Sequence, residues 1–368
     1  MFVELKFLLI LLFSFVITFG LSPLLITLLF KFNIRRTNKV DLEAFLPDRS
    51  VKFGKPIMGG IVIIICLVLV LFLFLSKSNF FFPFLLILIL GAFFGAVDEF
   101  INTIGRKGVS FAIRETVDSF VSKNLLFWKI YKTLLIPWDL FKEMMRVMGS
   151  TQRGLKTHDK FMMQTVVALI GCFWVYFILG RQAFWFPFLG DVNGGVLYFV
   201  LLLFLALVFA NAFGVTDGMD GLSAGLHSIS FLAYGCLALL TGNYDLAYFC
   251  AAIVGSELAF LYFNIHPARF EMSDVGTLPL GMLFVFIAAA LQKELSMFFI
   301  GGIFLIEILS SFIQQWSAKL RHGKRVFLLA PIHHHFEKKG WPETKVTMRF
   351  WLFSSIFAVI GLVISLIN

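Results

Sequence analysis

Charged side chains are scarce in this sequence. They make up 14% of the 368 residues, whereas a soluble domain carries about 25%. Hydrophobic residues account for 59%, which excludes an ordinary soluble domain and predicts an integral membrane protein. In a soluble protein the formal net charge of +9 would suggest a nucleic-acid partner. In a membrane protein it bears first on topology, and we expect no nucleic-acid partner.

Cysteine is also rare, and its placement excludes two kinds of site. The four cysteines lie inside apolar runs and form no CxxC pair: Cys66, Cys172, Cys236 and Cys250. Closely spaced cysteine pairs are typical of zinc centres and redox-active disulfides. We therefore expect these four residues to be core or lipid-facing thiols, with neither a disulfide nor a bound metal.

Long apolar runs dominate the chain instead. About 20 apolar residues span a bilayer as an α-helix, and ten runs qualify, approximately 7–30, 57–75, 80–97, 161–180, 195–213, 222–241, 244–263, 275–291, 297–316 and 349–367. They predict an all-α polytopic membrane protein that forms a single domain over residues 1–368, with about ten transmembrane helices. The first run lacks a small-residue cleavage site, so we expect a retained helix and not a signal peptide.

Basic residues are nearly absent from every second loop. With ten spans, loops 31–56, 98–160, 214–221, 264–274 and 317–348 share one side and contain 26 of the 31 lysines and arginines, whereas the opposite loops contain only Lys77, Arg181 and Lys293. The positive-inside rule places the basic loops in the cytoplasm and both termini on the periplasmic or outer side. Most of these charges need do no more than fix that orientation. The acidic and histidine motifs lie in the same loops, which predicts an active site facing the cytoplasm.

Two adjacent carboxylates end the third apolar run. Asp98 and Glu99 repel each other unless a cation or a proton lies between them. A solvated acidic cap is the alternative, but the C-terminal end of a helix disfavours negative charge. The position therefore favours a functional site.

A second acidic motif follows the fifth run, in the stretch Asn211–Leu222. Asp217 and Asp220 lie beside the expected bilayer, where carboxylates are costly and usually functional. In a continuous helix they would point in different directions. Glycines at 214, 218 and 221 permit a broken turn that could aim both at one point.

Three consecutive histidines, His333, His334 and His335, lie in a polar stretch between two apolar runs. Neighbouring residues diverge by about 100° in a helix and alternate faces in a strand, so the triplet alone is a poor metal chelate. Contact with a large anionic ligand from several sides fits this spacing better. His266, in the loop before the eighth run, is interpreted as an ordinary loop histidine.

The sequence of this stretch closely resembles a motif of one protein family. APIHHHFEKKGWPE at 330–343, followed by Arg349-Phe350-Trp351, is similar to the histidine-rich loop of the phospho-N-acetylmuramoyl-pentapeptide transferases, within the polyprenyl-phosphate N-acetylhexosamine-1-phosphate transferase superfamily. Other stretches agree. TDGMDGL at 216–222 resembles the family's TDGLDGL, Phe263–Thr277 resembles FNxxPAxxFMGDVGS, and Lys52 and Asp98 match the first residues of KxGTPTMGG and DDxxK.

The resemblance implies an activity and a site. Family members transfer phospho-MurNAc-pentapeptide from UDP to undecaprenyl phosphate with Mg²⁺, giving lipid I and UMP in bacterial peptidoglycan synthesis. Asp98, Asp274 and His333 are the implied catalytic residues, and Asp274 is the implied metal ligand. The implied substrate-binding residues are Lys52, Lys160, Asn211, Asp217, Gly218, Asp220, Asn264, Ala330, His334 and His335. The implied location is the bacterial cytoplasmic membrane, in contact with membrane lipids, and a homodimer stays open.

The chain departs from the family pattern at several positions. Lys55 and Ile57 replace two threonines, Glu99 replaces an Asp, Asn102 a Lys, Gly214 an Asn, Glu271 an aromatic that contacts the uracil ring, and Ser273 a Gly. Residues 111–150 form an insertion whose apolar residues recur every three or four positions with lysines between them. That pattern predicts an interfacial amphipathic helix.

Three other functions stay open at this point. A related transferase acting on a simpler N-acetylhexosamine nucleotide shares the aspartate motifs but lacks the APIHHH run. A non-catalytic scaffold would accommodate Asn102, Gly214 and Glu271. A transporter would place polar groups along a pathway through the membrane, whereas here the acidic groups cluster at one face.

Overall fold

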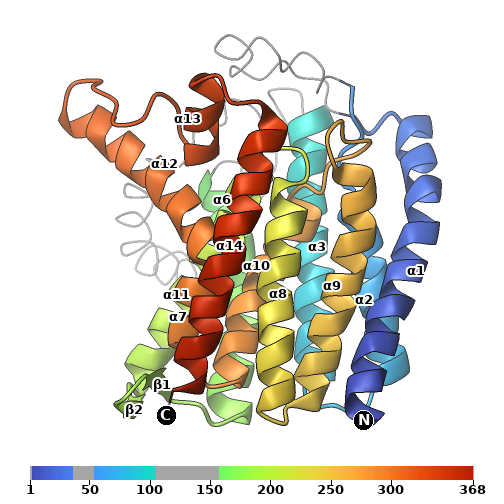
Figure 1. Cartoon of the computed structure of the whole chain (residues 1–368), viewed down its shortest axis with the longest axis vertical. Coiled ribbons are helices and arrows are strands. Elements are labelled where there is room, and N and C mark those ends of the chain that lie inside the picture. Colours follow the sequence, from blue (N-terminus) through green and yellow to red (C-terminus); the bar gives the residue numbers. More distant parts are fainter. Residues whose placement is uncertain (1, 36–53, 105–156, 368) are drawn as a thin grey trace, which may run out of the picture.

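The computed structural model describes residues 2–35, 54–104 and 157–367, and these are overwhelmingly helical (Figure 1). The elements in chain order are α1 (Phe2–Lys31), α2 (Ile61–Phe74), α3 (Phe81–Ile104), α6 (Thr157–Phe173), the π-helical turn η3 (Trp174–Ile178), β1 (Ala183–Phe186), β2 (Gly190–Asn193), α7 (Val196–Thr216), α8 (Leu222–Leu240), α9 (Tyr244–Asn264), α10 (Asp274–Ala290), the 3₁₀ turn η4 (Glu294–Ser296), α11 (Met297–Ile300), α12 (Gly302–Leu320), α13 (Ile332–Lys338) and α14 (Glu343–Leu366). The predicted all-α polytopic class is confirmed. Lys52 and the predicted interfacial helix at 111–150 lie outside the described residues.

All ten predicted apolar runs are helical. Among the described residues, seven helices are long and apolar enough to cross a membrane, and they correspond to α1, α3, α6 with η3, α7, α8, α9 and α14. An eighth segment consists of η4–α11 and α12, which meet at an angle of 76°. Helices α2 and α10 are shorter apolar helices, so the total of ten spans stays a prediction.

Helix α2 begins four residues later than the apolar run that predicted it. The backbone N–H groups of Gly59 and Gly60 donate hydrogen bonds to the carbonyls of Glu271 (2.7 Å) and Met272 (3.0 Å). These bonds hold the segment before α2 against the loop between α9 and α10. The first and the fourth polar loops are thereby joined beside the residue that starts α10.

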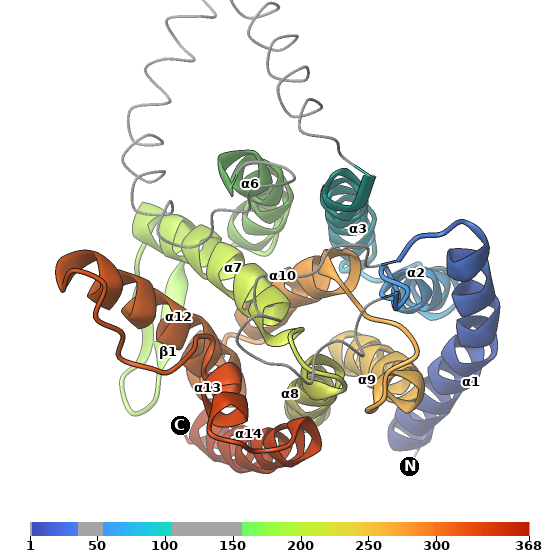
Figure 2. The same ribbon diagram turned by 90° about the horizontal axis from the view of Figure 1, so that it is seen from above.

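Helix α10 lies in the middle of the bundle, seen from above in Figure 2. Every residue from Val275 to Ala290 is buried, and α10 packs on α7 and α3. A helix that is apolar on all sides is stable only in an interior. This position places Asp274, the first residue of α10, among several helix ends.

A short antiparallel hairpin, β1–β2, was not predicted from the apolar runs. Phe184 pairs with Val192, and Phe186 pairs with Gly190. The hairpin is held to the bundle by Glu294, which accepts hydrogen bonds from the Trp185 N–H (3.3 Å) and the Tyr198 hydroxyl (2.8 Å). Because these are backbone and remote side-chain contacts, hydrophobic periodicity could not indicate them.

The two ends of the bundle differ in content. Both chain termini and the hairpin lie at one end, while α13 and the loops that follow α7 and α9 lie at the other (Figure 1). The polar motifs identified in the sequence therefore gather at the end opposite the termini. Which end faces the cytoplasm stays a prediction based on the basic residues.

Candidate active site

Two carboxylates and a lysine meet where α3, α6 and α10 converge. The Lys160 ammonium forms an ion pair with Asp98, and its Nζ lies 3.6 Å from Oδ2 of Asp274. Asp98 is 4% exposed, whereas the Asp274 side chain is 35% exposed. Apart from the ion pair, neither Asp98 oxygen has a hydrogen-bond partner among the described residues. A buried carboxylate with so few partners depends on a nearby cation.

The same grouping could hold a divalent metal. Carboxylate oxygens at the surface of a bundle are hard ligands of the kind that Mg²⁺ prefers, usually one or two together with substrate phosphates. Asp98 has unsatisfied oxygens and Asp274 is partly open to solvent. The donor set therefore fits magnesium.

The histidines of α13 form a hydrogen-bonded chain between two glutamates. Nδ1 of His333 lies 2.8 Å from Oε2 of Glu307, Nε2 of His333 lies 3.1 Å from Nε2 of His334, and Nδ1 of His334 lies 3.1 Å from Oε2 of Glu337. Each of these contacts needs one proton. Two neutral imidazoles carry one N–H proton each, so the third proton is shared among the rings and the carboxylates of the chain.

The turn between α7 and α8 links the histidine chain to the group formed by Asp98, Lys160 and Asp274. A Cβ at position 218 would lie 2.5 Å from Nε2 of His333, so Gly218 lets the turn between α7 and α8 approach the histidine closely. In the same turn, Asp217 Oδ2 accepts a hydrogen bond of 2.8 Å from the Ser273 N–H, next to Asp274. The turn thus connects the histidines with the Asp98–Asp274 group.

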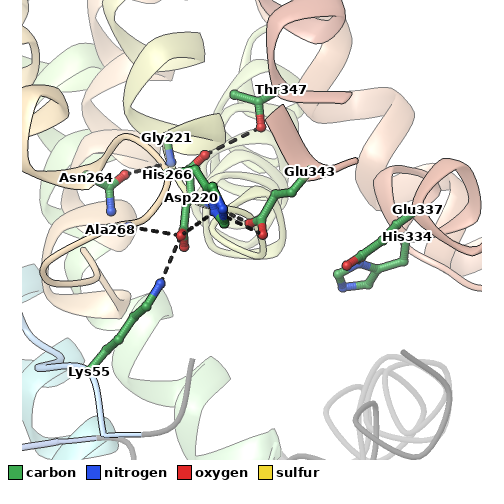
Figure 3. Close-up of polar contacts among 10 residues, drawn as sticks. All are labelled: Lys55, Asp220, Gly221, Asn264, His266, Ala268, His334, Glu337, Glu343 and Thr347. Atoms are coloured by element: carbon green, nitrogen blue, oxygen red, sulfur yellow. Dashed lines mark hydrogen bonds and ion pairs between the residues drawn. The ribbon is translucent and has the colours of Figure 1, made fainter. Parts of the chain in front are cut away.

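Asp220, in this turn, is the centre of a third group (Figure 3). Its Oδ2 atom lies 2.8 Å from Nζ of Lys55, 3.0 Å from the Ala268 N–H and 3.2 Å from Nδ1 of His266. The Asp220 N–H donates to Oε1 of Glu343 at 2.6 Å. Asp220 is 3% exposed, so its carboxylate is almost completely surrounded by these partners.

Two predicted substrate-binding amides are engaged within the protein. The Asn264 side chain accepts from the Gly221 N–H (3.0 Å) and donates to the Phe270 carbonyl (2.9 Å). Gly221 has a φ of 76°, which glycine adopts without strain. Asn211 pairs with Gln164 across α6 and α7, with its Nδ2 2.8 Å from Oε1. In this structure these amides brace the turn and the helices around the site.

His335 and Ala330 lie at the edge of the site. His335 points toward the preceding loop, where its Nδ1 accepts a hydrogen bond of 3.1 Å from the Leu328 N–H. Burial, and then the charge of Lys339, lower the pKa of His335. Ala330 lies two residues before α13 begins and is half-buried.

Five residues of these groups were not predicted as site members: Lys55, His266, Glu307, Glu337 and Glu343. Lys55 was noted only as a replacement for a threonine, and His266 was interpreted as a loop histidine. Glu307 had a usable signal, because an acidic residue inside an apolar run is usually functional. Lys55, His266 and Glu343 give no signal until the remote segments are brought together.

Comparison with known proteins gives the class and then the family. Residues 147–292 match the family described as Glycosyl transferase family 4. With the helical bundle, this match defines a multi-pass membrane phospho-sugar transferase. The chain is 40% identical over 245 residues to a phospho-N-acetylmuramoyl-pentapeptide-transferase of Francisella tularensis subsp. novicida (strain U112), covering 60% of this chain and 67% of the relative. It is 41% identical over 228 residues to one of Geobacillus thermodenitrificans (strain NG80-2), covering 60% and 68%. The chain belongs to the phospho-N-acetylmuramoyl-pentapeptide-transferase family.

Proposed function

We propose that the chain transfers phospho-MurNAc-pentapeptide from UDP-MurNAc-pentapeptide to undecaprenyl phosphate, with magnesium, at the cytoplasmic face of a bacterial inner membrane. The observation that carries this proposal is the convergence of Asp98, Lys160 and Asp274 at the bundle end that also holds the histidine chain. Sequence identity of about 40% to curated phospho-N-acetylmuramoyl-pentapeptide-transferases supports the proposal.

The reaction exchanges one phosphate anhydride for another. An oxygen of the lipid phosphate bonds to the phosphorus attached to the sugar, and the bond from that phosphorus to UMP breaks. The acceptor is already an anion near neutral pH, so no alkoxide has to be made. Positioning and charge neutralisation are then the main requirements. Magnesium bound at the carboxylates would supply much of the neutralisation of the pyrophosphate.

Under this proposal, Asp98, Lys160 and Asp274 have different roles. Asp274, partly exposed, is the ligand that presents the metal to substrate, and Asp98 supports it from the buried side. The Lys160 ammonium lies between them and reduces their mutual repulsion. A cation therefore lies beside Asp98 although Asn102 replaces a lysine of the family pattern. This arrangement favours a working site over a scaffold.

The histidine chain is held in place before substrate arrives. Glu307 and Glu337 bind the two rings from either side, and Gly218 lies against the His333 ring. Polar groups oriented in advance need no reorganisation when the substrate binds. We assign to His333 and His334 the binding of the diphosphate or of the groups next to it.

The test is release of UMP from defined substrates. Purified full-length protein in lipid nanodiscs is given undecaprenyl phosphate, magnesium and UDP-MurNAc-pentapeptide, and parallel samples receive UDP-N-acetylglucosamine or excess EDTA. We expect UMP only with the muramoyl nucleotide and magnesium. Release from UDP-N-acetylglucosamine alone would assign the chain to the related transferases, and no release from either would leave a scaffold.

A further inference from the structure

The group around Asp220 has the composition and spacing of a metal site separate from the carboxylates proposed to hold magnesium. Asp220, His266 and Glu343 come from the α7–α8 turn, the α9–α10 loop and the first residue of α14, and Figure 3 shows them pointing toward one another. Asp220 Oδ2 lies 3.2 Å from His266 Nδ1, which lies 3.7 Å from Glu343 Oε2. One ligand atom from each lies within 4.8 Å of the others.

These separations are close to what a tetrahedral cation requires. Zinc binds imidazole nitrogen and carboxylate oxygen at about 2.0–2.2 Å, so neighbouring ligand atoms of a tetrahedral site lie about 3.3–3.6 Å apart. The two distances at His266 fall on either side of that range. Small rotations of the half-exposed imidazole, whose side chain is 41% exposed, would bring both into it.

The donor set distinguishes this group from the magnesium site proposed at Asp98 and Asp274. An imidazole nitrogen with two carboxylates suits zinc and its first-row neighbours, whereas magnesium prefers oxygen ligands and keeps several waters. The Ala268 N–H donates to Asp220 Oδ2 at 3.0 Å, and such contacts hold ligating carboxylates in position. The exposed imidazole edge gives an ion a path from solvent.

Lys55 is the competitor for the same carboxylate. Its ammonium lies 2.8 Å from Asp220 Oδ2, and only 9% of the residue is exposed. A divalent ion at this oxygen would have to coexist with the ammonium or displace it. The lysine therefore weakens metal binding. Removing its charge should strengthen the binding, which can be tested.

We propose that Asp220, His266 and Glu343 form a binding site for a late first-row divalent cation, with zinc as the fitting ion, and that Lys55 competes with it. An ion bound there joins three segments of the chain and occupies Asp220, which the family resemblance implies in substrate binding. Weaker substrate binding in the presence of the ion rests on the proposed function, but the metal site itself does not.

Zinc titration of the intact protein tests this. The full-length chain, purified with a tag that contains no histidine, is titrated with zinc in the presence of millimolar magnesium by calorimetry. Cobalt(II) is added separately, because its visible absorption reports tetrahedral coordination. We expect one ion per chain, with His266→Ala and Glu343→Gln each weakening zinc binding by more than about tenfold. Lys55→Met should tighten it.

His322→Ala is the matched control, because His322 is an exposed histidine outside the group, and its zinc affinity should equal that of the wild type. His266 is partly exposed, so its removal leaves the protein folded, and the thermal midpoint without metal verifies this. Equal zinc affinity in wild type and His266→Ala would mean an adventitious ion only. Weaker binding in Lys55→Met would overturn the competition. The result does not depend on turnover, so it stands apart from the proposed transfer activity.

Discussion

Nδ1 of His333 lies 2.8 Å from Oε2 of Glu307, and both side chains are completely buried. Glu307 belongs to α12, and its other carboxylate oxygen has no hydrogen-bond partner in the described part of the chain. A buried carboxylate of this kind is stable only beside a positive charge or a proton donor. The pair therefore indicates that Glu307 fixes the orientation of the His333 ring.

Substituting Glu307 with Gln tests this relationship. The amide keeps the shape but replaces the carboxylate that orients the His333 ring. We expect kcat to fall by up to about 100-fold, the scale of a misplaced group in an active site. Leu309→Ala, at an exposed position of the same helix, should leave kcat unchanged, and wild-type kcat in Glu307→Gln would contradict the role.

Replacing Gly218 with Ala should disturb the site without unfolding the protein. The new Cβ would lie 2.5 Å from Nε2 and 3.0 Å from Cε1 of His333, and a fully buried ring has little room to move. The expected result is a large loss of turnover with an intact bundle by circular dichroism. Gly20→Ala in α1, where a Cβ meets nothing within 4 Å, is the control. Full activity in Gly218→Ala would show that the histidine need not hold this position.

Glu294→Ala should lower stability and leave the chemistry unchanged. The substitution deprives the Trp185 N–H and the Tyr198 hydroxyl of their acceptor, and each buried unsatisfied donor costs about 1–3 kcal/mol. A lower thermal midpoint in nanodiscs with kcat unaltered is expected, because the hairpin lies at the end away from the site. Tyr198→Phe, which removes one donor together with its hydrogen bond, should cost less than Glu294→Ala.

The lowered pKa of His335 predicts a pH dependence of stability. The unfolded chain takes up a proton at a pKa of about 6.5, before the folded chain does, so stability at this residue falls as pH drops below that value. Above it the residue makes no pH-dependent contribution. Protonation also removes the acceptor for the Leu328 N–H. Thermal midpoints of wild type and His335→Asn, measured from pH 8 to pH 5, should converge at low pH. A constant difference would contradict the assignment.

The sequence predicted the helices well because they depend on local hydrophobicity. All ten apolar runs became helices, including the bent segment that joins η4–α11 and α12. The aspartates and histidines of the site were found through family resemblance. Several residues that contact these aspartates and histidines were not predicted. Lys55 and Asp220 are 165 residues apart, and no periodicity relates them. Glu343 and His266 likewise meet Asp220 only after three separate segments have packed together.

The effect of the departures from the family pattern also depends on how remote segments pack together. Asn102 replaces a family lysine near Asp98, yet Lys160 from α6, which the resemblance already implied, places a cation beside this carboxylate. A single sequence could not show this pairing, because it requires the relative placement of α3 and α6. Gly214 lies beside Asp274, where a Cβ would be 3.2 Å from Oδ1. The structure gives no reason for the exchange of a family aromatic for Glu271.

The most direct test of the account is magnesium-dependent UMP release by wild type and Asp274→Asn, measured under the same conditions with UDP-MurNAc-pentapeptide and undecaprenyl phosphate. Asp245→Asn, at a half-buried position in the first turn of α9, is the matched control. The account predicts wild-type turnover in the control and near-complete loss in Asp274→Asn, which should stay folded with an unchanged helical spectrum. Wild-type turnover in Asp274→Asn would contradict the central role given to the Asp98–Lys160–Asp274 group.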